Sequence, residues 1–159
     1  MTNILVLGAS GYTGKEVSRA FSRAGFRVRS LVRNEEEARL LAQDEIHPIV
    51  GDIKRLDLLT ERLDEADVIV DTSIDYSESL ETTRNILNAV KQAGERRAHR
   101  GGQLTFIHTS GVWVQGETGY LGVSQDWNLQ PLEGVAWRVR IEQETLELAR
   151  ALNVRPVVL

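Results

Sequence analysis

Near its N-terminus the chain carries the run Gly8-Ala-Ser-Gly-Tyr-Thr-Gly14, in which glycine recurs at every third position. The short apolar run Asn3–Leu7 precedes it and predicts a buried strand. From Thr13 to about Ala24 apolar residues recur at helical spacing, and Gly25 ends the predicted helix. A glycine-rich turn between a strand and a helix presents the free N–H groups of the helix N-terminus to an anion.

Each glycine of this turn has its own expected role. Gly8 permits the tight turn, Gly11 lets the backbone approach a phosphate, and Gly14 lets the helix pack close to the sheet. Placed between a first strand and its helix, the pattern predicts a loop that wraps the pyrophosphate of a nicotinamide dinucleotide. The alternative is an ordinary tight turn without a ligand. The expected loop ligands are Gly8, Ser10, Gly11, Tyr12, Thr13 and Gly14.

The rest of the chain alternates predicted strands and helices. Further strands are expected at Arg27–Val32, Ile46–Val50, Val68–Asp71, Gln103–His108 and from Arg155 onward. Further helices are expected at Glu35–Gln43, Leu56–Leu63, Ser77–Ala93 and Ala136–Leu152, with Gly94 as a C-cap and Gly116–Pro131 as a loop. This order predicts an α/β fold, a Rossmann-type doubly wound parallel sheet of about six strands with helices on both faces.

The length of the chain suits one domain, so we expect residues 1–159 to form a single NAD(P)-binding unit. Its last residues, Val157-Val158-Leu159, lie inside an apparent strand and are followed by no polar tail. A buried strand is an unusual place for a protein to end. This pattern predicts that the chain is truncated relative to a longer parent.

Residues that follow the predicted strands are expected to contact the rest of the cofactor. Arg33 closes the second strand, about 20 residues after the glycine loop, where an acidic residue would suit NAD and an arginine suits the 2′-phosphate of NADP. NADP is therefore expected, with NAD or a plain surface arginine as the alternatives. Asp52 is expected to accept a hydrogen bond from the adenine amino group or to act as a helix N-cap, and Ile53 is expected to pack on the adenine ring. Thr72 and Ser73 follow the fourth strand at the ligand-binding edge.

Composition excludes several classes of protein. A net charge of −4 argues against a general nucleic-acid binder, and the basic run Glu95–Arg100 is explained as a solvated helix end. Without cysteine there is no disulfide or thiol chemistry, and no apolar stretch reaches the ~20 residues that span a bilayer. His47, His99 and His108 show no metal-ligand spacing, so no metal site is expected. A cytoplasmic protein that contacts neither nucleic acid nor membrane is the expectation.

Several motifs in order along the chain carry a family resemblance. They are Gly8–Gly14, Leu31-Val-Arg33, Val50-Gly-Asp-Ile53, Ala66-Asp-Val-Ile-Val-Asp71, Glu81-Thr-Thr-Arg-Asn-Ile-Leu87, Phe106-Ile-His-Thr-Ser-Gly-Val-Trp-Val-Gln-Gly116 and Arg155-Pro156-Val157. With these motifs the chain resembles the short-chain dehydrogenase/reductase superfamily, in the extended and atypical branches of NAD(P)-dependent epimerases, dehydratases and NmrA-like proteins. The resemblance implies that most of a substrate pocket would come from a C-terminal lobe beyond the sixth strand.

The catalytic part of the family pattern matches poorly. The resemblance implies a serine or threonine after the fifth strand and a Tyr-x-x-x-Lys pair, in which the tyrosine is the general acid/base. No Tyr-x-x-x-Lys occurs in this chain, and the aligned positions of the pair fall near Gly134 and Arg138. The remaining catalytic candidates are Thr109, Ser110 and Tyr120. Thr109 is also expected to contact the cofactor. Tyr12, Tyr76 and Tyr120 are each better explained as packing or surface residues, and His108 as a hydrogen-bonded, non-catalytic histidine.

These observations leave three hypotheses open. The first is an NADP-dependent oxidoreductase or epimerase-like enzyme of the atypical branch, with an unknown small-molecule substrate. The second is a non-catalytic NADP-binding redox sensor or regulatory module of the NmrA-like type. The third is a truncated, inactive fragment that keeps the fold. A homodimer is compatible with each of them.

Overall fold

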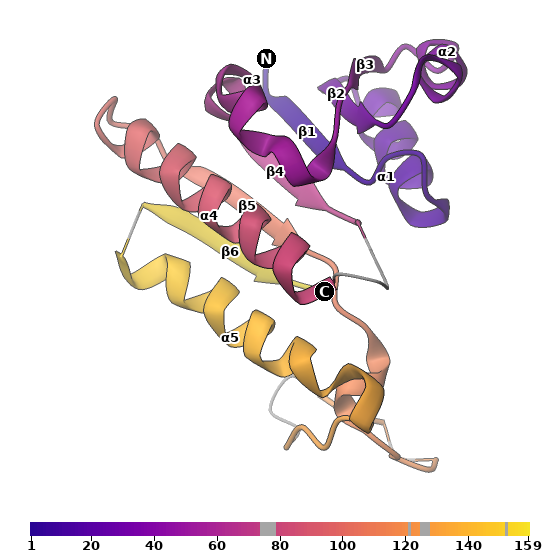
Figure 1. Ribbon diagram of the computed structural model, residues 1–159, viewed down its shortest axis with the longest axis vertical. Helices are drawn as coiled ribbons and strands as arrows, with labels where there is room; N and C mark the ends of the chain where they lie inside the picture. Colours follow the sequence, from indigo (N-terminus) through magenta and orange to yellow (C-terminus); the bar gives the residue numbers. More distant parts are fainter. Residues whose placement is uncertain (74–78, 121, 125–127, 152) are drawn as a thin grey trace.

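A single parallel sheet organises the protein, with strand order β3-β2-β1-β4-β5-β6 (Figure 1). The computed structural model describes residues 1–73, 79–120, 122–124, 128–151 and 153–159. The strands are β1 (Asn3–Leu7), β2 (Arg27–Val32), β3 (His47–Val50), β4 (Val68–Asp71), β5 (Leu104–His108) and β6 (Val154–Val158). All neighbouring strands pair in parallel, so the predicted fold class is confirmed.

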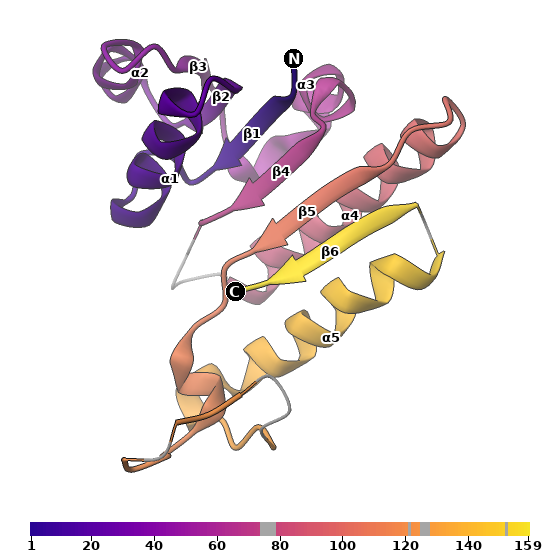
Figure 2. The same cartoon turned by 180° about the vertical axis from the view of Figure 1, so that it is seen from behind.

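Helices cover both faces of the sheet, as Figures 1 and 2 show from opposite sides. One face carries α1 (Tyr12–Arg23) and α2 (Glu35–Ala42), and the other carries α3 (Thr60–Glu65), α4 (Ser79–Ala98) and α5 (Ala136–Ala151). Short 3₁₀ turns lie at Ile53–Leu59, Val112–Gln115 and Glu133–Val135. None of the helices in the described ranges is long and apolar enough to cross a membrane.

Alternation along the strands divides the core between the two faces. In β1, Ile4 and Val6 belong to the cluster under α1 and α2, whereas Leu5 and Leu7 belong to the cluster under α3, α4 and α5. Both sets are buried, which explains why β1 reads as a continuous apolar run and lacks an alternating pattern. The strand that leads into the glycine loop is therefore fixed from both sides.

The long fourth helix does not end where the sequence predicts. Gly94 was expected to cap it, but α4 continues to Ala98, so that prediction is wrong. A Cβ on Gly94 would lie 2.4 Å from Cγ2 of Val154, a distance that real Cβ atoms essentially never show, so the helix or the valine would have to move. Gly94 is therefore needed because α4 passes close over β6, and a contact between distant parts of the chain explains this glycine.

The basic run at the end of α4 is more than a solvated helix end. Arg96 donates from Nε to both carboxylate oxygens of Asp64, at 2.7 and 2.9 Å. Arg97 donates to Asp67 and to the carbonyl oxygen of Gln103, the latter at 2.9 Å. Both arginines are half-buried, so the expectation of a freely solvated end is wrong for them. They join the C-terminus of α4 to the segments before β4 and β5.

The predicted helix Leu56–Leu63 is divided into two pieces. Asp52 accepts from the N–H of Lys54 at 2.9 Å and starts a 3₁₀ turn, in which Arg55 has non-helical φ and ψ of −121° and 47°. The regular helix α3 begins only at Thr60, whose hydroxyl donates to the carbonyl oxygen of Asp57 at 2.8 Å. Side-chain bonds to the backbone thus compete with one continuous helix.

Candidate functional site

The carboxyl ends of the parallel strands meet at one edge of the sheet, and the glycine loop lies there between β1 and α1. Gly8 has a φ of +76°, in the left-handed region that favours glycine. A Cβ on Gly8 would lie 2.7 Å from Cα of Ser73, and one on Gly14 would lie 2.3 Å from the carbonyl oxygen of Gly8. The predicted turn at Gly8 and close packing at Gly14 are both present.

The N-terminus of α1 faces outward from this loop. Gly11 is its N-cap, without a side-chain cap, and its N–H donates to the carbonyl oxygen of Gly8 at 3.1 Å. The next N–H groups, of Tyr12 and Thr13, have no acceptor inside a helix by the geometry of a helix end. Gly11, Tyr12 and Thr13 are exposed, and the first turn contains no acidic residue. An anion can therefore approach these N–H groups.

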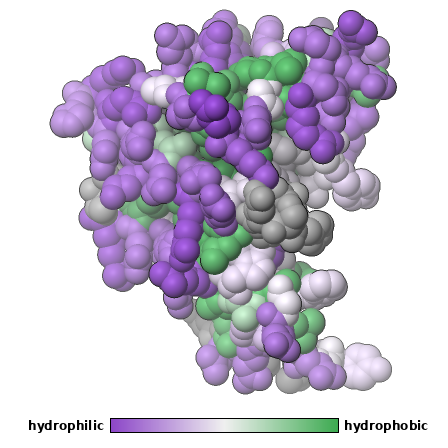
Figure 3. All heavy atoms as spheres, viewed as in Figure 1, coloured by the Kyte–Doolittle hydropathy of each residue, from purple (hydrophilic) through white to green (hydrophobic). Residues whose placement is uncertain are grey.

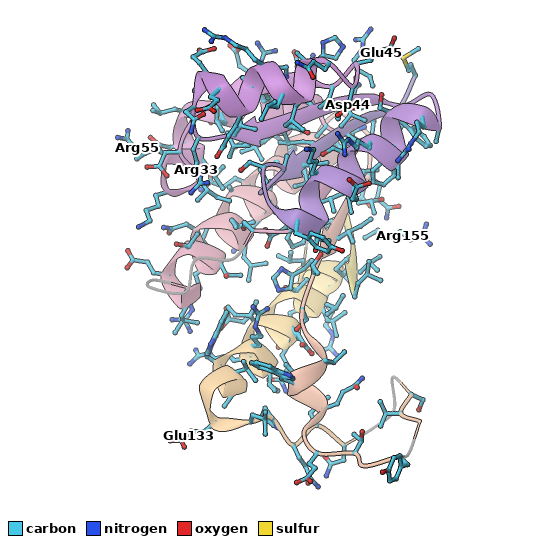
Figure 4. The ribbon with its side chains drawn as sticks, turned by 90° about the vertical axis from the view of Figure 1, so that its right-hand side faces the viewer. Arg33, Asp44, Glu45, Arg55, Glu133 and Arg155 are labelled. Atoms are coloured by element: carbon cyan, nitrogen blue, oxygen red, sulfur yellow. The ribbon has the colours of Figure 1, made fainter. Side chains whose placement is uncertain are left out.

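Arg33 stands at the end of β2, where it forms an ion pair that sequence reasoning missed. Its Nη2 donates to Oε1 of Glu37 at 2.9 Å, and its backbone N–H donates to Oε2 at 3.0 Å. The Arg33 side chain is 81% exposed and that of Glu37 only 19%. Figure 4 shows Arg33 pointing outward on the same side of the molecule as Arg55. The spacing of four residues was the available signal for this pair.

Glu37 also reaches back to the glycine loop. Partial burial opposes its charged form, but hydrogen bonds from Arg33 and from the Ser10 hydroxyl outweigh that effect and lower the pKa of Glu37 below its ordinary value. Asn34 caps α2 by accepting from the N–H of Glu37 at 2.9 Å. One carboxylate therefore connects the glycine loop, the end of β2 and the start of α2.

Asp52 and Ile53 follow β3 on the same edge. The N–H of Gly51 donates to the carbonyl oxygen of Val32 at 2.9 Å, which keeps the ends of β2 and β3 together. Asp52 is exposed and caps the following turn, as its alternative role predicted. Ile53 is half-buried against the core. The Asp52 carboxylate thus stands beside the strand end that carries Arg33.

A buried polar cluster closes β4 and β5. Asp71 and His108 are directly opposite in the register, and Oδ2 of Asp71 lies 2.9 Å from Nδ1 of His108. Oδ1 of Asp71 accepts from the N–H and the hydroxyl of Ser73, at 3.0 and 2.5 Å. Thr72 donates its hydroxyl to the carbonyl oxygen of Leu7 at 2.8 Å. Thr72 and Ser73 are therefore fixed against the glycine loop by contacts inside the protein.

The catalytic candidates are not brought together as a group. Thr109 and Ser110 are half-buried after β5, and the Ser110 hydroxyl donates to the Glu142 carboxylate on α5. Tyr120 is fully exposed in the segment between β5 and α5, which extends beyond the sheet in Figure 1. Tyr76 lies outside the described residues. The structure thus pairs Ser110 with Glu142 and leaves Tyr120 apart from them.

The positions aligned with the family's tyrosine and lysine lie at the start of α5. Gly134 is exposed in a 3₁₀ turn, and Arg138 is buried with its guanidinium carbon 4.8 Å from the centre of the Trp137 ring. A guanidinium that stays protonated does not replace a lysine that tunes a tyrosine. Across the described ranges, no group of three or more potential ligand side chains could hold a metal ion.

Comparisons with known proteins show which family and which relatives the chain resembles. A model of the NmrA-like family matches residues 1–98. An uncharacterized protein of Schizosaccharomyces pombe is 32% identical over 121 residues, which cover 75% of this chain and 40% of that protein. A decarboxylating sterol-4-alpha-carboxylate 3-dehydrogenase of Dictyostelium discoideum is 23% identical over 148 residues, covering 86% of this chain and 44% of the relative. The chain spans less than half the length of these curated relatives.

The fold also matches solved structures. The dTDP-glucose 4,6-dehydratase of Bacillus anthracis, solved in complex with NAD, superposes with a TM-score of 0.78 at 18% identity. The superposition covers 99% of this chain and 54% of the dehydratase. The match to the family model confirms the NmrA-like part of the resemblance, and the likeness to the dehydratase confirms the Rossmann-type fold.

Proposed function

We propose that this chain, which belongs to the NmrA-like family, binds a nicotinamide dinucleotide with its pyrophosphate on the loop Gly8–Gly14. The proposal rests on the N-terminus of α1, which has no side-chain cap, so its N–H groups are open to an anion. The loop that leads into it has no room for a side chain at Gly8 or Gly14. The NAD complex of the Bacillus anthracis dehydratase, whose fold this chain shares, supports the same class of cofactor.

The rest of the cofactor would extend along the carboxyl edge of the sheet in both directions. On the β2–β3 side, Asp52 and Ile53 would hold the adenine and Arg33 the ribose end. On the β4–β5 side, Thr72, Ser73 and Thr109 would line the nicotinamide end. Ser10 and Thr13 would add hydroxyl donors around the pyrophosphate. Bound there, the cofactor would supply hydride chemistry, and the protein would orient it.

We propose that NADP is preferred over NAD because of Arg33. Its guanidinium is exposed at the end of β2, where a 2′-phosphate would meet it as a charge-assisted partner. Glu37 already occupies one side of that guanidinium, so a 2′-phosphate must compete with this carboxylate. The preference is therefore expected to be modest, and Glu37 is expected to weaken it.

Dinucleotide binding is the function supported best, and a non-catalytic sensor or regulatory module is the reading favoured for this chain. The observation behind it is the absence of Tyr-x-x-x-Lys from the sequence, together with Gly134 and Arg138 at the aligned positions. An NADP-dependent oxidoreductase or epimerase-like activity is the second candidate. Ser110 beside Glu142 is the observation that favours it, because that pair could exchange a proton with a bound substrate.

Calorimetric titration of the purified chain with NADPH and, separately, with NADH tests the proposal. We expect saturable binding of one dinucleotide per chain, with NADPH bound several-fold more tightly. The matched variant Gly11→Val places a branched side chain where the pyrophosphate must approach and should abolish binding. Unchanged affinity in that variant would mean that the loop is only a turn. Equal affinities for the two cofactors would remove Arg33 as the discriminating residue.

A further inference from the structure

The opposite end of the sheet carries a cluster of cations that the dinucleotide site does not use. Because side chains alternate along a strand, Arg27, Arg29 and Leu31 of β2 share one face, and His47 of β3 lies opposite Arg29 in the register. Leu31 is buried in the core near the carboxyl end. Toward the amino end the same face carries the half-buried Arg29 and the exposed Arg27.

These cations line a hollow of about 500 Å³ beside α3. Its walls are Arg27, Arg29, His47, Pro48, Ile49 and Arg62. In Figure 1, β3 is the edge strand and β2 lies next to it, and Figure 3 shows hydrophilic side chains over much of the upper half of that view. The glycine loop lies toward the other ends of the strands; at about 3.3 Å per residue, Gly8 is roughly 17 Å along the sheet from the row of Arg27 and roughly 10 Å from that of Arg29. The hollow is thus separate from the dinucleotide site.

Only one carboxylate neutralises these guanidinium groups among the described residues. Oε2 of Glu65 pairs with Arg29 at 2.5 Å and with Arg62 at 3.2 Å. Arg27 is exposed and forms no ion pair with any described carboxylate. Three guanidinium groups against one carboxylate leave an excess of positive charge, in a chain whose net charge is −4. Such a local excess attracts anions against the overall charge of the protein.

We infer that this hollow, defined by Arg27, Arg29, His47 and Arg62, is a second anion site that takes a phosphate or diphosphate group of a small molecule. A guanidinium fork matches the oxygens of a phosphate, and the His47 ring adds a further donor. After pairing with Glu65, the three guanidinium groups still carry more positive than negative charge. A ligand with a single carboxylate would bring only one negative charge to balance this excess. A phosphate or diphosphate group brings two or more negative charges and matches it better.

Titration of the isotope-labelled chain with inorganic pyrophosphate, monitored through its amide NMR signals, tests this site. We expect saturable shifts at the amides of Arg27, Arg29 and His47, with affinity that falls at high salt. Pyrophosphate also suits the glycine loop, so the titration is repeated in the Gly11→Val variant. Shifts at the hollow should persist there even if loop binding is lost, which keeps this test independent of the proposed dinucleotide site.

The double variant Arg27→Gln, His47→Gln should weaken pyrophosphate binding at the hollow at least tenfold. Both side chains are exposed, so the fold should survive, which the spectrum of the variant checks directly. Arg155→Gln on β6 is the matched control, because it removes an exposed arginine from the other edge strand. Acetate should bind far more weakly than pyrophosphate. Shifts confined to Gly8–Gly14, equal binding of acetate, or full affinity in the double variant would each overturn the inference.

Discussion

The β1–β3 half of the sheet and the β5–α5 half differ in how closely neighbouring atoms restrict their functional positions. In the first half, Gly8 and Gly14 have no room for a side chain. In the second half, a Cβ on Gly134, the position aligned with the family's tyrosine, would meet nothing within 4 Å, and Tyr120 is fully exposed. The proposed dinucleotide binding thus rests on positions that the fold restricts, whereas the position aligned with the family's tyrosine lies where the fold permits substitution.

The largest expected effect comes from Gly14→Val in the restricted half. The new side chain would overlap the carbonyl oxygen of Gly8, so we expect a loss of about 4 kcal/mol in the free energy of unfolding and no measurable NADPH binding. Urea denaturation and calorimetry measure the two effects. Gly134→Ala is the matched control and should change stability by less than about 0.5 kcal/mol. Similar losses in both variants would erase the contrast between the halves.

His108→Phe tests the polar cluster that joins the two halves. The change removes the partner of Oδ2 of Asp71 while the carboxylate stays buried, so we expect a loss of about 3 kcal/mol in the free energy of unfolding. Asp71→Asn keeps an acceptor for Ser73 and should cost less. Denaturation midpoints of both variants give the answer. A larger loss for Asp71→Asn than for His108→Phe contradicts this account.

Arg33→Asp should change cofactor preference without changing the fold. It removes the guanidinium and adds a carboxylate that suits the 2′-hydroxyl of NAD, so NADPH affinity should fall about tenfold and NADH should become the tighter ligand. Glu37→Gln is the companion variant and should raise NADPH affinity by a few-fold because it removes a competing carboxylate. Titrations of both variants are compared with wild type. An unchanged preference in Arg33→Asp points to another 2′-phosphate ligand.

In the β5–α5 half, Ser110→Ala should have a small effect on NADPH binding. It breaks the hydrogen bond between the Ser110 hydroxyl and Glu142, for a loss of about 1 kcal/mol in stability. NADPH affinity should change less than about twofold, because the dinucleotide loop is untouched. Calorimetry and thermal unfolding measure both quantities. A loss of affinity as large as that of Gly11→Val would place Ser110 among the principal cofactor ligands.

The smallest expected effect is a pH dependence that originates at Glu37. Its pKa is lower in the folded protein, so its contribution to stability is present above the ordinary carboxyl pKa and is lost as the pH falls through the folded value. The Arg33 partner is exposed, which limits the contribution to about 0.5 kcal/mol or less. Comparison of the acid limb of the unfolding curve in wild type and Glu37→Gln measures it. Identical acid limbs would show that Glu37 does not contribute.

A feature can be predicted from the sequence when the residues that determine it lie close together along the chain. The alternation of strands and helices and the roles of Gly8 and Gly14 depend on short-range patterns, and the sequence reveals them. The pairing of Asp71 with His108 depends on the register of two strands, although a hydrogen-bonded His108 was expected and is confirmed. Gly94 was misread as a C-cap because its reason lies in β6, which the local pattern of α4 cannot reveal.

The contact between Gly94 and Val154 also has a consequence for evolutionary variation. A larger residue at position 94 is accommodated only if position 154 becomes smaller, or if α4 moves away from the edge strand. The two positions are therefore expected to covary among homologues, although many residues separate them in the chain. A homologue that carries alanine at the first position and keeps valine at the second should show α4 displaced from β6.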